Sequence, residues 1–129
     1  MNFTLSLAER LLYSTVKITA LNQGNIIGTG TGFFTTFNQT IESIVPVLIT
    51  NKHVITGADQ IRITCHIAEE KIYKPSGTFI EVNIFLHDTL FNHPDPNIDL
   101  CAISTGSILQ QAIDRKIPIF YAPITMDTI

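Results

Sequence analysis

This sequence of 129 residues has few cysteines, few charged residues and no long apolar run, and each shortage excludes a class of protein. Charged residues make up only 15% of the chain, and 8 Lys and Arg stand against 11 Asp and Glu, so no basic surface for nucleic acid is expected. Two cysteines do not form a disulfide scaffold. No apolar run approaches the roughly 18 residues that a membrane-spanning helix needs. The sequence therefore predicts a protein that binds neither nucleic acid nor a membrane.

Apolar residues are plentiful at 45% of the chain, which is enough to form the core of one globular domain. The N-terminus lacks the basic start, apolar stretch and small-residue cleavage site of a secretory signal, so we expect a cytoplasmic protein with free thiols. The spacing of Ser6 and Glu9 is that of a capping box and predicts a helical lead-in over residues 1–12.

Apolar and polar residues alternate along much of the chain, and this period of two predicts β-strands with one buried face. Alternating runs, or runs of branched apolar residues, lie at residues 16–20, 26–35, 44–50, 61–67, 80–86 and 98–104. Roughly six short strands separated by turns are typical of a barrel or sandwich, so we expect an all-β domain over residues 13–105. Pro118 and Pro123 indicate a linker in residues 106–129.

Two segments contain residues suited to acid–base chemistry. His53 follows the strand at 44–50, and one helical turn is expected between it and Gly57. A histidine held at the end of a rigid strand can face a cleft as a general base. Asp99 lies among apolar neighbours at the start of the last strand, where we expect a desolvated carboxylate that needs a donor such as an imidazole N–H. An Asp in that position would orient the His ring and stabilise its charged form.

The same two segments resemble the motifs of trypsin-like serine peptidases, which have the chymotrypsin fold. Thr50–Val54 is similar to the family's Thr-Ala-Ala-His motif, and Asn97–Ile103 is similar to its Asp-Ile-Ala-Leu motif. Gly28–Phe34 resembles the Gly-Ser-Gly-Phe strand that precedes the His motif in the family. The three landmarks occur in the family's order, which is more specific than any one of them alone.

The resemblance covers residues 13 to 104 and implies the first of the family's two barrels. We therefore expect a six-stranded antiparallel Greek-key barrel, preceded by the short N-terminal helix that the capping box predicts. It implies a serine endopeptidase with a polypeptide substrate, in which His53 is the base and Asp99 fixes its tautomer. No metal or other cofactor is required. Val54 stands where secreted members have a Cys, which favours the bacterial or HtrA-like branch.

The family's nucleophile is not found, because no serine of this sequence has glycine on both sides. The second barrel, with the oxyanion hole and the specificity pocket, is missing too, so we expect residues 106–129 to be a linker toward it. The chain alone is expected to be inactive, and its exposed inter-barrel face is expected to cause self-association.

Two alternatives to a peptidase remain open. A non-catalytic trypsin-like barrel, a pseudoenzyme, would use its groove to bind other proteins. A small β-barrel unrelated to peptidases would place the side chains of His53 and Asp99 far apart.

Other interpretations of the sequence are weaker. The glycines of Gly28–Gly32 lack the Lys-Ser/Thr of a P-loop, and no helical pattern follows them, so we do not expect nucleotide binding. The remaining histidines and the cysteines match no metal-ligand spacing, so no metal site is expected. We expect His93–Pro96 to form a rigid turn, and Cys65 and Cys101 to be small apolar residues within strands.

Overall fold

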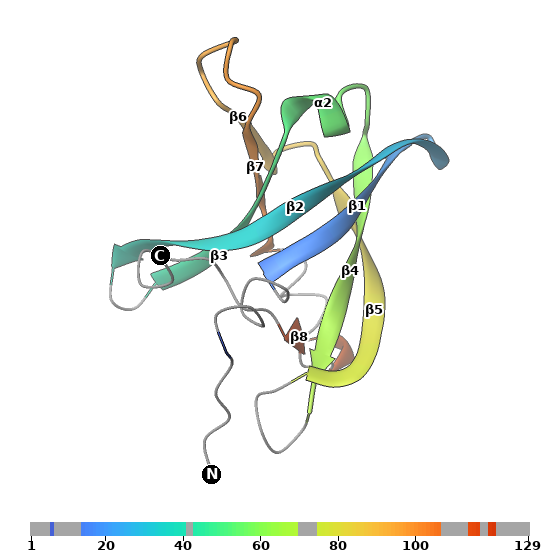
Figure 1. Ribbon diagram of the computed structural model, residues 1–129, viewed down its shortest axis with the longest axis vertical. Helices are drawn as coiled ribbons and strands as arrows, with labels where there is room; N and C mark the ends of the chain where they lie inside the picture. The colour runs from blue at the N-terminus through green and yellow to red at the C-terminus, as the bar shows by residue number, and fades with distance from the viewer. Residues whose placement is uncertain are drawn as a thin grey trace.

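The computed structural model describes residue 6 and residues 14–40, 43–69, 75–106, 114–116 and 119–120. They form an all-β structure in which an antiparallel sheet carries a short helix at one end, which confirms the predicted class (Figure 1). The elements are β1 (Thr15–Asn22), β2 (Asn25–Thr40), β3 (Ser43–Thr50), α2 (Lys52–Ile55), β4 (Gln60–Ala68), β5 (Pro75–Phe85), β6 (Leu90–Asn92), β7 (Cys101–Ser104) and β8 (Ile119–Phe120).

The paired strands follow the order β5-β4-β1-β2-β3-β7-β6, and β8 pairs with β4 outside this path. The described residues therefore form seven strands in an open path, with β8 as an eighth strand beside β4, where the sequence predicted six strands in a barrel. Each of the six predicted strands overlaps one of β1 to β5 or β7. The additional strands, β6 with 3 residues and β8 with 2, are too short to leave a periodic pattern in the sequence.

Residues 86–89 join the two strands at the ends of this path. The backbone N–H of Leu86 donates to the carbonyl of Asp59, next to β4, at 3.0 Å. The carbonyl of Thr89 accepts from the backbone N–H of Ser104 in β7 at 2.9 Å. The chain thus passes from one end of the paired sheet to the other within this short segment.

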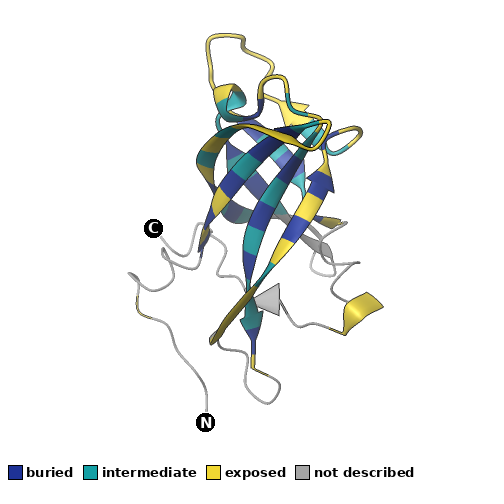
Figure 2. Cartoon of the chain, turned by 90° about the vertical axis from the view of Figure 1, so that its right-hand side faces the viewer, coloured by how far each residue is buried: buried dark blue, intermediate teal, exposed yellow. Residues whose placement is uncertain are grey.

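The core lies along the inward faces of the strands, and buried residues alternate with less buried ones (Figure 2). In β1, Val16 and Ile18 are buried while Lys17 is exposed. Ile84 of β5 belongs to the same core cluster that Leu90 of β6 packs against, so the sheet coils around a single core. Each fully buried Ile stabilises the fold by about 1.5–3 kcal/mol.

Two predicted segments precede and follow these strands in the sequence. The helical lead-in over residues 1–12 lies outside the described residues, apart from Ser6. Within the predicted linker, β8 pairs antiparallel with β4 through Ile67 and Ile119, so this part of the chain returns to the sheet. No helix in the described part of the chain has the length and apolar character needed to cross a membrane.

Candidate functional site

The glycine-rich part of β2 packs against α2, and the contact between Gly30 and Val54 is called here the seat of α2. A β-carbon added to Gly30 would lie 2.5 Å from Cγ2 of Val54, closer than real side chains approach one another. Glycine at this position therefore leaves the space that Val54 occupies, and Val54 and Ile55 in turn contact the core. The segment Gly28–Gly32 is a strand with a packing role, and it fixes the helical turn that carries His53.

The helical turn itself follows directly after β3, as predicted. The hydroxyl of Thr50, a buried residue at the end of β3, donates to the carbonyl of Thr31 in β2 at 2.9 Å and anchors the start of the turn. Thr56 donates its hydroxyl to the carbonyl of Lys52 at 2.9 Å. Gly57 then adopts a φ of 83°, a left-handed conformation that ends helices and favours glycine. His53 is thus held on a short element that is tied to β2 at its start and ends at Gly57.

Asp99 belongs to the loop of residues 93–100 between β6 and β7, called here the Asp99 loop. The backbone N–H of His93 donates to the carbonyl of Leu100 at 2.9 Å and closes the base of this loop. Within it, the carboxylate of Asp95 accepts from the backbone N–H of Asn97 at 2.9 Å, and two prolines restrict the backbone further. These features agree with the rigid turn predicted at His93–Pro96.

The structure brings His53 and Asp99 together at the end of the sheet where α2 and the Asp99 loop both lie (Figure 1). Nδ1 of the His53 ring is hydrogen-bonded to Oδ2 of Asp99, and the backbone N–H of His53 donates to Oδ1 at 3.0 Å. A carboxylate only accepts hydrogen bonds, so the ring carries its proton on Nδ1. In the neutral ring this leaves Nε2 unprotonated, and Nε2 has no hydrogen-bond partner among the described residues.

The hydrogen bond from the His53 side chain lowers the pKa of Asp99 below its ordinary value of 3.8, although slight desolvation acts in the opposite direction. The backbone N–H and the charge of His53 lower this pKa further. The prediction of a carboxylate desolvated by apolar neighbours at the start of a strand was wrong, because the Asp99 side chain is 47% exposed and that of His53 is 72% exposed. The reason is that β7 begins only at Cys101, which leaves Asp99 and Leu100 in the exposed loop.

The two cysteines are free thiols in the core, which confirms that they pack as small apolar residues. Burial raises the pKa of Cys65 to about 12. Burial also raises the pKa of Cys101, and the negative charge of Asp99 adds to this effect. Neither thiol is therefore disposed to become a thiolate nucleophile. In the described part of the chain, no three His, Cys, Asp or Glu residues gather in a way that could hold a metal ion.

Sequence reasoning missed two polar residues that contact the Asp99 loop. Nδ2 of Asn51 donates to the carbonyl of Asp99 at 2.9 Å. Nζ of Lys52 donates to the carbonyls of His93 and Asp95, at 2.9 and 3.1 Å. The only sign of these contacts in the sequence is that Asn51 and Lys52 are two polar residues between a buried strand and His53. The sequence does not show which groups their side chains bind.

The site therefore consists of a largely exposed histidine, whose neutral form has Nε2 available as a base, and a carboxylate that fixes the ring. Such a pair can remove a proton from a hydroxyl group or a water molecule and can stabilise the resulting imidazolium. Comparisons with family models, curated proteins and solved structures found no match to this chain.

Proposed function

We propose that this chain supplies the catalytic base and its orienting carboxylate to a trypsin-like serine endopeptidase. The observation that carries the proposal is the double contact of Asp99 with the ring and the backbone N–H of His53. In a Ser-His-Asp triad the Asp holds the His in the tautomer with the proton on Nδ1, which is the tautomer that this contact requires. The three sequence segments that resemble the family, in β2, at α2 and in the Asp99 loop, also adjoin one another here.

The energetics of the pair favour a functional role over a structural one. Both side chains are largely open to solvent, and exposed ion pairs contribute little to stability. Nevertheless Asp99 and its loop accept hydrogen bonds from Asn51, Lys52 and His53. A firmly oriented pair that adds little to stability is typical of a site whose geometry serves chemistry.

In the proposed reaction, Nε2 of His53 removes the proton from a serine hydroxyl while that oxygen attacks the carbonyl carbon of a peptide bond. The imidazolium then gives this proton to the leaving amine, and Asp99 stabilises the positive charge in between. We place the serine and the oxyanion-binding N–H groups in a second barrel outside these 129 residues, since no serine of this sequence has glycine on both sides. No metal or other cofactor takes part in this scheme.

We also propose that the sheet acts as the six-stranded Greek-key barrel of that family. The order β4-β1-β2-β3 is the spatial order of a Greek key. Residues 86–89 run from the end of β5, where Leu86 bonds beside β4, to the start of β6, where Thr89 bonds to β7. β5 and β6 can therefore be regarded as one bent strand that lies between β4 and β7. Counted in this way, β8 is an addition to six strands.

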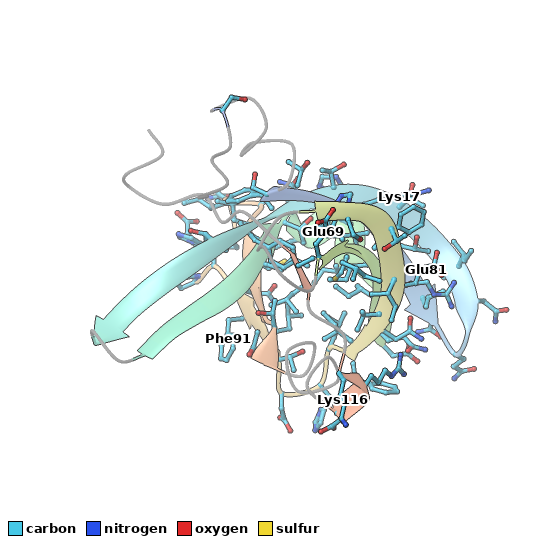
Figure 3. All side chains as sticks on the ribbon, turned by 90° about the horizontal axis from the view of Figure 1, so that it is seen from below. Lys17, Glu69, Glu81, Phe91 and Lys116 are labelled. Carbon is cyan, nitrogen blue, oxygen red and sulfur yellow. The ribbon has the colours of Figure 1, made fainter. Side chains whose placement is uncertain are left out.

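An apolar row on the outer face of the sheet suits contact with the proposed second barrel. The row consists of Phe33, Ile49, Ala102 and Phe91, which are in register across β2, β3, β7 and β6. Phe91 is 63% exposed, and in the view of Figure 3 it lies on the opposite side of the molecule from Glu81. Phe91 is exposed and the other three residues are partly exposed, so the row leaves a contiguous apolar surface open next to the site, as interaction surfaces do.

Beside the apolar row lies an open pocket of about 180 Å³. It is lined by Ile49, Phe91, His93, Leu100, Cys101 and Ala102. This volume is smaller than that of most ligand pockets and suits a single side chain of a partner protein. We propose that the second barrel covers the row and the pocket, and that copies of this chain associate through them when that barrel is absent.

The proposal is tested on the full encoded protein, including whatever the reading frame holds after Ile129. We expect a Gly-x-Ser-Gly loop there and hydrolysis of a peptide library. His53→Ala should lower kcat on the order of 10⁶-fold, and Asp99→Asn should lower it on the order of 10⁴-fold. The matched control is His87→Ala, which removes an exposed histidine paired with Asp88 at 3.3 Å and should leave kcat unchanged.

Two results would contradict this proposal. Peptide hydrolysis by residues 1–129 alone, abolished by His53→Ala, would show that the nucleophile lies within these residues. An encoded protein that ends without a serine loop would favour a non-catalytic protein-binding module.

Docking through the apolar row is tested by sedimentation velocity of the 129-residue chain over a range of concentrations. Phe91→Ser should reduce self-association, whereas Phe79→Ser, on β5, should not. Phe79 is a suitable control for Phe91, because the two side chains have the same exposed fraction of 63%. A wild-type chain that stays monomeric at millimolar concentration, or equal effects of the two substitutions, would contradict the docking proposal.

A further inference from the structure

Three consecutive residues at the start of α2 donate hydrogen bonds to the Asp99 loop. Asn51 donates its side-chain amide to the carbonyl of Asp99 at 2.9 Å. Lys52 donates its ammonium group to the carbonyls of His93 and Asp95 at 2.9 and 3.1 Å. His53 donates its backbone N–H to the carboxylate of Asp99 at 3.0 Å. The same short segment therefore carries the base and holds the loop that carries its partner.

Burial does little to hold this loop in place. Every residue from Phe91 to Leu100 is exposed, so the loop gains little from the removal of apolar surface from water. The hydrogen bonds within the loop, such as that from the Ile98 N–H to the Asp95 carbonyl at 3.1 Å, fix its shape. They do not fix its position relative to α2. The contacts from Asn51 and Lys52 do this, because they connect the loop to α2.

The two side chains act on different parts of the loop. Lys52 holds its first part, through the carbonyls of His93 and Asp95, and a charged donor makes these bonds stronger than neutral ones. Asn51 holds the second part, through the carbonyl of Asp99 itself. With both parts fixed, the carboxylate of Asp99 is left little freedom to move away from the His53 ring.

From these contacts we infer that Asn51 and Lys52 are positioning residues, which set the distance and orientation of Asp99 relative to His53. Their importance for catalysis rests on the proposed function, but the positioning itself is measurable without any nucleophile or substrate. Catalysis is sensitive to such positioning, because a misplacement of about 1 Å costs on the order of 10²-fold in rate.

The test uses the full 129-residue chain with Lys52→Met, Asn51→Ala and both together. Lys17→Met is the matched control, since Lys17 is an exposed lysine of β1 and its loss removes the same charge. Hydrogen exchange of the His53 amide reports on its bond to Asp99, and the carbon NMR signal of the Asp99 carboxyl reports on its titration. In the double variant we expect the His53 amide to exchange about tenfold faster. We also expect the Asp99 pKa to move up toward 3.8.

Amides of β4, such as that of Ile63, show whether the variants remain folded. Faster exchange confined to His53 and the Asp99 loop supports the inference. A uniform increase across β4 and the loop would show a general role in stability and would overturn it. So would an unchanged His53 amide and an unchanged Asp99 titration in the double variant. Lys52→Arg, which keeps a long cationic donor, should retain most of the slow exchange.

A failure of the proposed function gives a different result from a failure of the positioning role. If the encoded protein hydrolyses no peptide while the exchange and titration respond as expected, the peptidase proposal fails and the positioning role stands. In an active encoded protein, Lys52→Met should lower kcat by up to about 10²-fold with little change in KM. The Lys17→Met variant should leave both constants unchanged.

Discussion

The inner strands of the sheet and the end that carries His53 and Asp99 are held together by different forces. In β1 and β4, Ile18, Ile61 and Ile63 are completely buried. The Asp99 loop is exposed throughout and is attached to α2 by hydrogen bonds from side chains and backbone. Burial therefore stabilises the part of the molecule without candidate chemistry, and directional polar contacts arrange the part that has it.

Because different forces hold the two regions, we expect that each can be altered with little effect on the other. The two regions meet at the seat of Val54 on Gly30, where α2 packs on the sheet. Substitutions in the core should change the free energy of unfolding, and substitutions among the polar contacts should change the His53–Asp99 geometry. A substitution at the seat should change both.

The largest effect is expected in the core. Ile63→Ala removes a fully buried side chain from the centre of β4 and should lower the free energy of unfolding by about 2–5 kcal/mol. Ile27→Ala is the same chemical change at a residue that is 48% exposed, and it should cost much less. Urea denaturation of the two variants measures the difference. Equal costs would mean that burial does not dominate in this region.

A smaller effect is expected at the seat of α2. Gly30→Ala places a β-carbon 2.5 and 2.6 Å from the two methyl groups of Val54 and should destabilise the fold by about 1–3 kcal/mol. It should also disturb the His53–Asp99 contact, visible as faster exchange of the His53 amide. Gly28→Ala is the control, because its β-carbon would only come within 4.0 Å of the Val54 carbonyl.

The double variant Gly30→Ala with Val54→Ala sharpens this test. Removing the methyl groups that the new β-carbon meets should restore part of the stability and slow the His53 amide again. If Gly30→Ala is as well tolerated as Gly28→Ala, the strand is not the seat that positions α2.

The strands could be predicted because alternation along a chain follows directly from the geometry of a half-buried strand. Val16, Ile18 and Ala20 are inward-facing residues of β1, and the intervening residues face outward or are only partly buried. Residue chemistry alone indicated that Asp99 suits an imidazole partner, and the resemblance to a known family identified His53 as that partner. Local patterns carry no information on which distant segments of a chain approach each other.

The exposure of Asp99 and the contacts of Asn51 and Lys52 could not be predicted, because they depend on the path of the loops between the strands. The start of β7 at Cys101, and with it the exposure of Asp99, follows from the path of the Asp99 loop and not from the apolar neighbours of that residue. The contacts of Asn51 and Lys52 likewise end on backbone carbonyls, which every residue has and which therefore leave no mark on the sequence.

The smallest effect is expected from the titration of the pair itself. The folded-state pKa of Asp99 is lowered below 3.8, so the folded protein binds this proton less readily than the unfolded chain. The contribution to stability is therefore present in full above the unfolded value and is lost as the pH falls through the lowered pKa. Urea denaturation from roughly pH 2 to 6 should show wild type and Asp99→Asn differing most at the upper end and converging in acid.

Because removing a carboxylate also changes the net charge, Asp88→Asn provides the control, at an exposed carboxylate that contacts His87 instead. Its free energy of unfolding should follow that of wild type more closely across the same range. A difference between wild type and Asp99→Asn that stays constant, or that widens as the pH falls, would show that the His53 contact does not favour the charged form of Asp99. The region held by polar contacts would then lack the electrostatic coupling that distinguishes it from the core.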